Sequence, residues 1–338
     1  MKLLFRLGTL LLGVGCLVML SLILSGESHT LAALGSPDLQ LFKLLFLRIL
    51  LEAFPFILIG VLFSALLQMF VSDELIAKIM PRNPFIGVVF GGLLGLLFPL
   101  CECGMIPVVR RLIRKGMPAY IGIVYLLAGP IVNPVVFLST YAAFRSTPAI
   151  AYSRMGIAFL VATVIGLLIY RFTKGNLLKE QVKLAVLPHS QATHGSTGPK
   201  PVRFRSRLSG TIGHASEELF DMGKYLIIGA LLTAMMQSFV DREALSAIAD
   251  QPVLAYPFMM GFAFLLSICS TSDAFIASSF TGIFSAGPLL AFLVFGPMID
   301  IKNMLMLLSA FRTKIVLAVA LGAFVLVLAG AALMEAAL

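Results

Sequence analysis

Long runs of apolar residues, separated by short polar stretches, make up most of this 338-residue chain. Because a helix needs about 20 apolar residues to cross a bilayer, we expect membrane-spanning helices at residues 7–25, 51–71, 118–144, 152–172, 219–240, 287–310 and 313–335. Two further apolar segments, 84–115 and 252–284, are interrupted by polar residues, glycine and proline. We interpret each of these two as a re-entrant hairpin, although short full spans would also fit the pattern.

The two halves of the chain have related sequences. Residues 60–79 align without gaps with residues 229–248, and the match continues from Cys101 to Cys269. Each repeat would contain three crossings and one hairpin, and an odd number of crossings makes the two repeats inverted. The predicted fold is therefore an all-α integral membrane protein built from two inverted repeats, with an extra N-terminal helix. Its predicted parts are an anchor helix and connector (1–37), repeat 1 (38–172), a linker (173–215) and repeat 2 (216–338).

Composition and charge agree with a membrane protein. The chain is 59 % hydrophobic and 12 % charged. Most of the net charge of +9 comes from the polar linker, so it does not indicate a nucleic-acid partner. The basic residues of this linker are Lys174, Lys179, Lys183, Lys200, Arg203, Arg205 and Arg207. By the positive-inside rule, the linker and the N-terminus with Lys2 and Arg6 lie in the cytoplasm.

The first broken segment contains the stretch FPLCECGMIP, residues 98–107, which we call the first tip. Cys101 and Cys103 would point in opposite directions on a helix, so their thiols converge only where the backbone is extended or turns. Gly104 permits such a turn, and Pro107 suits the first turn of a new half-helix that starts near Met105. Glu102 adds a carboxylate at membrane depth, where ionisable groups usually mark a site or a pathway.

The second broken segment contains LLSICSTSDAF, residues 265–275, which we call the second tip. It offers the Cys269 thiol, the Ser270 hydroxyl and the Asp273 carboxylate. We expect the two tips to face each other and to form a substrate-binding site. Thiolates select soft ions such as Cu(I) or Zn(II), so Cys101, Cys103 and Cys269 are candidate metal ligands. The alternative is that these cysteines are small packing residues.

A second candidate layer lies in the repeated sequences GPIVNP (129–134) and GPMID (296–300). Asn133 and Asp300 occupy equivalent positions and could bind a substrate group. Asp300 is also the carboxylate best suited to couple a proton, unless Lys302 pairs with it. A plain proline kink with Asn133 as a helix cap is the alternative. The candidate hinge residues are Gly104, Pro107, Gly129, Pro130, Pro134, Gly296 and Pro297.

Two further acids, Glu52 and Asp221, are expected to begin equivalent helices in the two repeats. There they would act as N-terminal caps, as charges at the membrane edge, or as gates.

The stretches LCECGMIPVVRRLIRKGMP, LLAGPIVNPVVFLSTYAAF, CSTSDAFIASSF and FGPMIDIKN together resemble the predicted permease family that includes the ArsP organoarsenical efflux permeases and the YraQ-like permeases. The resemblance covers nearly the whole chain beyond the first span. It implies export of a soft substrate across the bacterial cytoplasmic (inner) membrane, with Cys101, Cys103 and Cys269 as thiol ligands. Trivalent organoarsenicals are the implied substrate in some members, and Cu or Zn in others. The second tip has a single cysteine and no second C-x-C.

No enzyme motif is present, since the Walker loop, HExxH and G-x-S-x-G are all absent. We therefore predict no enzymatic activity and no cofactor. The main hypothesis is a secondary-active efflux permease that contacts the lipid bilayer and a small soft ion or organoarsenical. The alternatives are a membrane subunit with a partner subunit, or a homodimer, and a membrane thiol-redox protein.

Overall fold

The computed structural model describes residues 37–70, 83–98, 100–172, 223–235 and 252–336, with isolated positions at 76, 78, 80, 81 and 220. Across these residues the fold is helical, and an isolated β-bridge joins Thr281 and Phe284. Four helices are long and apolar enough to cross a membrane: Gln40–Ser64, Ala149–Phe172, Ala286–Ala310 and Thr313–Glu335. The expected anchor helix at 7–25 and the expected linker at 173–215 lie outside the described residues.

Both halves of the chain follow the same order of elements. Each has a short apolar helix, a loop, a second short helix, a helix pair with a break, and a long helix. In the first half these are α4 (Pro84–Leu97), α5 (Glu102–Arg114), α6 (Ala119–Ala128), α7 (Pro134–Ala143) and α8 (Ala149–Phe172), preceded by α2 (Pro37–Phe70). In the second half they are α12 (Pro252–Leu266), α13 (Asp273–Ser278), α14 (Ala286–Met298), α15 (Ile301–Ala310) and α16 (Thr313–Glu335), preceded by the helix Gly223–Met235.

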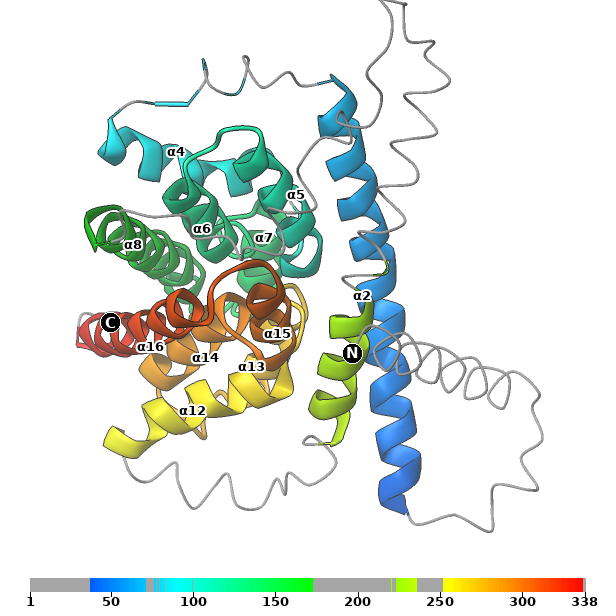
Figure 1. Cartoon of the computed structure of the whole chain (residues 1–338). Helices are drawn as coiled ribbons and strands as arrows, with labels where there is room; N and C mark the ends of the chain where they lie inside the picture. Colours follow the sequence, from blue (N-terminus) through cyan, green and yellow to red (C-terminus); the bar gives the residue numbers. More distant parts are fainter. Residues whose placement is uncertain are drawn as a thin grey trace, which may run out of the picture.

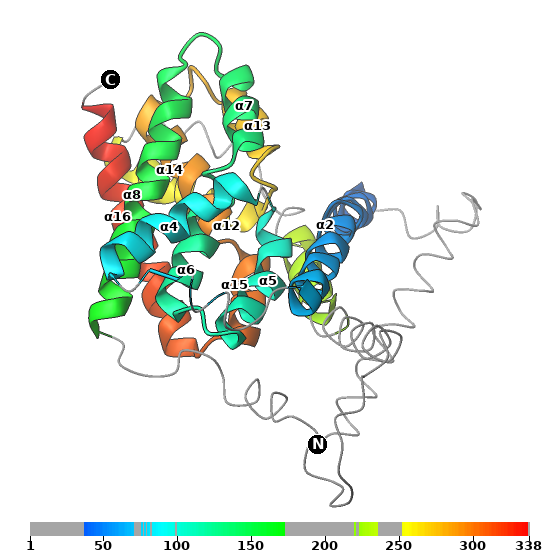
Figure 2. The same cartoon turned by 90° about the horizontal axis from the view of Figure 1, so that it is seen from above.

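The packing of the helices follows the same repeat. α4 packs against α6 and α8, as α12 packs against α14 and α16. The short helices that follow the two tips each contact the opposite half. α5 of the first half contacts α15, and α13 of the second half contacts α7. α8 and α16 lie side by side between the halves (Figures 1 and 2). α2 stands at the edge of this body, next to the helix Gly223–Met235 (Figure 1).

Local sequence explains where several helices begin. The side chains of Asn83 and Asn133 each accept a hydrogen bond from the backbone N–H two residues later, at 3.1 and 2.9 Å, and each is followed by proline at the first helical position. The side chain of Asp300 caps α15 by accepting a hydrogen bond from the backbone N–H of Asn303, three residues later. These are the residue types that best satisfy the free N–H groups of a first turn. The interruptions expected near residues 129–134 and 296–300 are therefore present as capped breaks.

Three details differ from the sequence expectations. α2 is one helix from Pro37 to Phe70, so Glu52 lies within it and does not begin it; its counterpart Asp221 lies outside the described residues. α5 begins at Glu102, three residues before the expected start, because the N–H groups of Gly104 and Met105 already bond to the Cys101 carbonyl. Gly296 and Pro297 belong to the last turn of α14, and the break follows at Ile299 and Asp300.

α2 and α5 cross at very close range. A Cβ atom added to Gly60 of α2 would lie 2.5 Å from both the Cα atom and the carbonyl oxygen of Gly104 in α5. Pairs of small residues commonly allow membrane helices to approach this closely. The crossing fixes α2 against the helix that follows the first tip.

We expect Gly60→Ala to destabilise the protein, because the new methyl group would overlap the backbone of α5. Gly156→Ala is the matched control, since nothing lies within 4 Å of the Cβ position at Gly156 in the middle of α8. Thermal unfolding of both purified variants in detergent measures the difference. Equal melting temperatures for Gly60→Ala and Gly156→Ala would show that the α2–α5 crossing is looser than described.

Candidate functional site

The two tips meet at one pocket beside α2, which we call the tip pocket. Its lining combines thiols, carboxylates and an ammonium group with a few apolar side chains. The lining residues are Ile49, Glu52, Ala53, Cys101, Glu102, Cys103, Ser267, Cys269 and Lys302. Cys101, Glu102 and Cys103 come from the first half, and Cys269 comes from the second half. The structure thus brings all three candidate thiols to one cavity.

The backbone of the first tip turns the two thiols of the C-x-C sequence toward each other. Cys101 has an extended conformation, with φ −74° and ψ 163°, and immediately precedes α5. The side chains of Cys101 and Cys103 both line the tip pocket. Cys103 is buried and Cys101 is half-buried, so both thiols are available to the pocket at an irregular stretch of backbone.

Lys302 lies at the centre of the charged groups in the tip pocket. Its Nζ atom is 4.0 Å from Oε1 of Glu102 and 4.0 Å from Oδ2 of Asp300. All three side chains are almost completely buried. The pairing of Lys302 with Asp300 was one of the two outcomes left open by the sequence, and Lys302 also joins Glu102 of the other half.

The tip pocket is small in this structure. It encloses about 20 Å³, which is roughly the room for one water-sized group. A larger molecule could enter only if the tips or α2 moved apart. Within the described ranges, no three His, Cys, Asp or Glu side chains are grouped so that they could hold a metal ion.

Ser267 adds a second kind of irregularity to the tip pocket. Its φ of 47° is unusual for a residue with a side chain, and its hydroxyl is buried without a hydrogen-bond partner. Strained backbone of this kind often occurs at functional sites. The sequence analysis did not single out Ser267, because its conformation depends on the surrounding fold.

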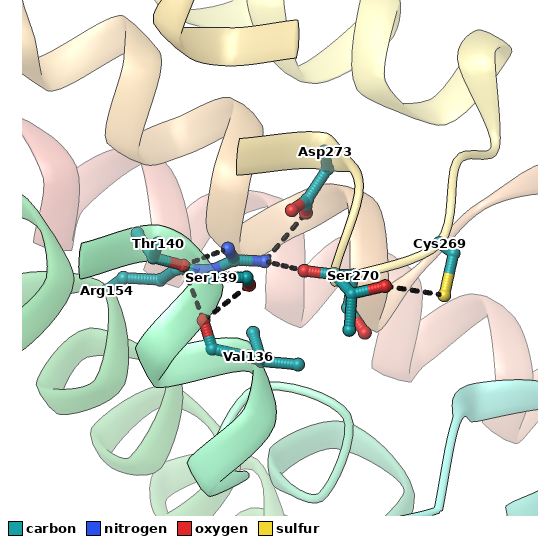
Figure 3. Close-up of polar contacts among 8 residues, drawn as sticks. Val136, Ser139, Thr140, Arg154, Cys269, Ser270 and Asp273 are labelled. Atoms are coloured by element: carbon teal, nitrogen blue, oxygen red, sulfur yellow. Dashed lines mark hydrogen bonds and ion pairs between the residues drawn. The ribbon is translucent and has the colours of Figure 1, made fainter. Parts of the chain in front are cut away.

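The second tip is held by a buried arginine of the first half. Arg154 of α8 donates hydrogen bonds to Oδ2 of Asp273 at 2.6 Å and to the Ser270 carbonyl at 3.2 Å. It also donates to Oγ1 of Thr140 at 2.7 Å, which fixes the guanidinium against α7 (Figure 3). Cys269 lies on the far side of the same turn, with its sulfur 3.5 Å from Oγ1 of Thr271. Arg154 thus clamps the segment that carries Cys269.

Arg154 was missed by the sequence analysis, although a signal was available. It is a basic residue well inside the apolar helix Ala149–Phe172, away from its ends, and such residues usually face the protein interior and pair with an acid. Its partner Asp273 is 119 positions away in the sequence, so only the fold reveals the pair.

The other candidate site residues lie outside the lining of the tip pocket. Asn133 caps α7, and Ser270 and Asp273 belong to the Arg154 clamp. Asp300 caps α15 and reaches the pocket only through Lys302. The proposed site residues therefore separate into the tip pocket, the clamp and two helix caps.

Comparisons with known proteins identify relatives over most of the chain. The family model ArsP_1, described as "Predicted permease", matches residues 38–336. The UPF0718 protein YcgR of Bacillus subtilis is 48 % identical over 292 residues, which cover 86 % of this chain and 96 % of that protein. A Streptococcus mutans protein named "Putative two-component membrane permease complex subunit" is 37 % identical over 273 residues, or 81 % of this chain and 88 % of that protein. No solved structure matches the chain.

We expect Arg154→Met to destabilise the protein by about 3–5 kcal/mol, because the change leaves the Asp273 carboxylate buried without its partner. The double variant Arg154→Met/Asp273→Asn should lose less than the sum of the two single changes, since the residues are coupled. Unfolding by SDS in mixed micelles measures these differences. Arg145→Gln, at an exposed position between α7 and α8, is the control. Additive losses would contradict the clamp.

Proposed function

This chain belongs to the ArsP_1 family of predicted permeases, and on that premise we propose that it is a secondary-active carrier, without enzymatic activity, that exports a soft, thiol-binding substrate. It is a multi-pass membrane protein with relatives named as a permease subunit and as a UPF0718 protein. The proposed substrate is a trivalent arsenical or a heavy-metal ion. The proposed location is the bacterial cytoplasmic membrane, with the N-terminus and the 173–215 linker in the cytoplasm.

The observation that carries this proposal is the convergence of three thiols on one pocket. Cys101 and Cys103 of the first half and Cys269 of the second half all line the tip pocket. Thiol ligands favour soft ions over hard ones. A trivalent arsenical would bind by forming S–As bonds. For each S–As bond formed, one As–OH bond would break, and its hydroxyl group would leave with the thiol proton as one water molecule.

The small size of the tip pocket supports a carrier mechanism. The thiols share a cavity but do not form a ready metal cluster, so a bound substrate would draw the two tips together. A ligand that binds one conformation better than another shifts the population toward it. We propose that the two halves are inverted repeats, and that the tips open alternately to the two sides of the membrane. The repeated element order and the crossed contacts of α5 and α13 support this proposal.

Export against a gradient requires coupling to another solute. We propose that Glu102 or Asp300 carries the coupled proton. Both carboxyl groups are buried, and each has one oxygen without a hydrogen-bond partner. Buried carboxyl groups in membrane carriers commonly form proton relays.

We expect replacement of any one of the three pocket cysteines by serine to weaken binding of phenylarsenite or Cd²⁺ by at least about tenfold, equivalent to about 1.4 kcal/mol. Serine retains the size of the side chain but removes the soft sulfur ligand. Isothermal titration of the purified protein measures the affinity. Cys16→Ser is the control, because this cysteine belongs to the N-terminal apolar run.

Two results would contradict the thiol-binding proposal. The first is unchanged affinity in Cys101→Ser, Cys103→Ser and Cys269→Ser. The second is the absence of binding by the wild-type protein across arsenicals, Cu(I), Zn²⁺ and Cd²⁺.

A second candidate function is that of a membrane subunit in a two-component permease. The name of the Streptococcus mutans relative favours this alternative. In this version the basic linker at 173–215 would bind the partner subunit, and the tip pocket would serve the whole complex.

The two candidates differ in what the isolated chain can do. If the chain is a complete carrier, the purified protein alone should transport substrate in liposomes. If it is a subunit, transport should require a co-purifying protein that is lost when residues 173–215 are deleted. Transport by the lone chain at the same rate as in membranes would rule out the subunit version.

A further inference from the structure

Lys302 places a positive charge in a pocket whose other ionisable groups would attract a cation. Glu52, Glu102 and Lys302 line the pocket together with the three thiols. Lys302 is only 5 % exposed, and it is buried in the company of Glu102 and Asp300, which are 2 % and 1 % exposed. Burying an ammonium group costs free energy unless carboxylates compensate its charge. Charged side chains at membrane depth usually mark a functional site.

The ammonium group of Lys302 lies between two carboxylates without being locked to either one. It is 4.0 Å from Oε1 of Glu102 on α5 and 4.0 Å from Oδ2 of Asp300, which caps α15. A tight charge-assisted hydrogen bond would measure about 2.7–2.9 Å. Oε2 of Glu102 and Oδ2 of Asp300 have no hydrogen-bond partner. Each acid therefore retains an oxygen with free lone pairs, and in Asp300 it is the oxygen that faces Lys302.

Lys302 of α15 packs closely against Gly229 of the neighbouring helix Gly223–Met235. A Cβ atom on Gly229 would lie 3.0 Å from the Cα atom and 3.4 Å from the Cβ atom of Lys302. This close contact fixes the base of the side chain between α15 and the helix Gly223–Met235. The charge is therefore a permanent part of the pocket, and only the flexible end of the side chain can move.

We propose that Lys302 is a tethered cation, which fills the position between Glu102 and Asp300 that a free monovalent cation such as Na⁺ would otherwise occupy. The inference rests on the proposed function in that the tip pocket is the cargo site. With a cation built into the chain, one ammonium group serves two acids from opposite halves, so either acid can take up the proposed proton while Lys302 stays paired with the other. Cargo binding then needs no Na⁺.

The test measures the thermal unfolding of the full-length protein in detergent without cargo. Melting temperatures in NaCl are compared with those in choline chloride at equal ionic strength. The wild type and Lys302→Arg, which retains the charge, should not respond to Na⁺. Lys302→Gln should gain a Na⁺-dependent rise in melting temperature on the order of 2–4 °C. Lys314→Gln, at an exposed position in α16, is the control and should behave like the wild type.

A second variant shows where the new Na⁺ site lies. The double variant Lys302→Gln/Asp300→Asn should lose the response to Na⁺, because one of the two carboxylates is gone. If Lys302→Gln is recovered as folded protein in NaCl but not in choline chloride, Na⁺ has replaced the ammonium group and the proposal is supported.

Three outcomes would overturn the proposal: a Na⁺-dependent wild type, a folded Lys302→Gln that does not respond to Na⁺, or a Lys302→Gln that stays unfolded in both salts. None of these measurements uses thiol binding. A failure here therefore leaves the thiol site standing, and a failure of the cysteine variants leaves the Lys302 result unchanged.

Discussion

A charged side chain buried among apolar helices must meet a charge of opposite sign, and this constraint governs both tips. Glu102 is the first residue of α5, and Asp273 is the first residue of α13. Each of these acids meets a basic residue from the other half, Lys302 in one case and Arg154 in the other. Because loss of one partner leaves an uncompensated charge, these contacts tie the two halves together where their helices are broken.

The two contacts differ in strength, and the difference matters for function. Arg154 and Asp273 form a tight pair at 2.6 Å, and the guanidinium has further partners on α7 and in the second tip. Lys302 lies 4.0 Å from carboxylate oxygens of Glu102 and Asp300, in a small pocket lined by three thiols. Arg154 therefore holds the second tip firmly, whereas the contact of Lys302 with Glu102 in the tip pocket is loose. A bound substrate would act on the looser contact.

Local chemistry made much of this arrangement predictable from the sequence. Apolar runs predicted the helices, and the Gly-Pro sequences predicted the breaks, at which Asn133 and Asp300 cap the helices that follow. The internal repeat predicted that Cys269 would join Cys101 and Cys103, and all three line the tip pocket. The Arg154–Asp273 pair was not predicted, because no local pattern links residues so far apart. The start of α5 was also misplaced, since Pro107 was taken to mark the first turn. The inverted orientation of the repeats stays a prediction.

The central claim is that thiols from both halves act on one substrate in one pocket. The most direct test is X-ray absorption at the mercury L edge on a full-length variant that retains only Cys101 and Cys269, with one equivalent of Hg²⁺. The account predicts two sulfur ligands around mercury in this variant, and one in each variant that retains a single cysteine. One sulfur ligand in the variant with both cysteines would contradict it.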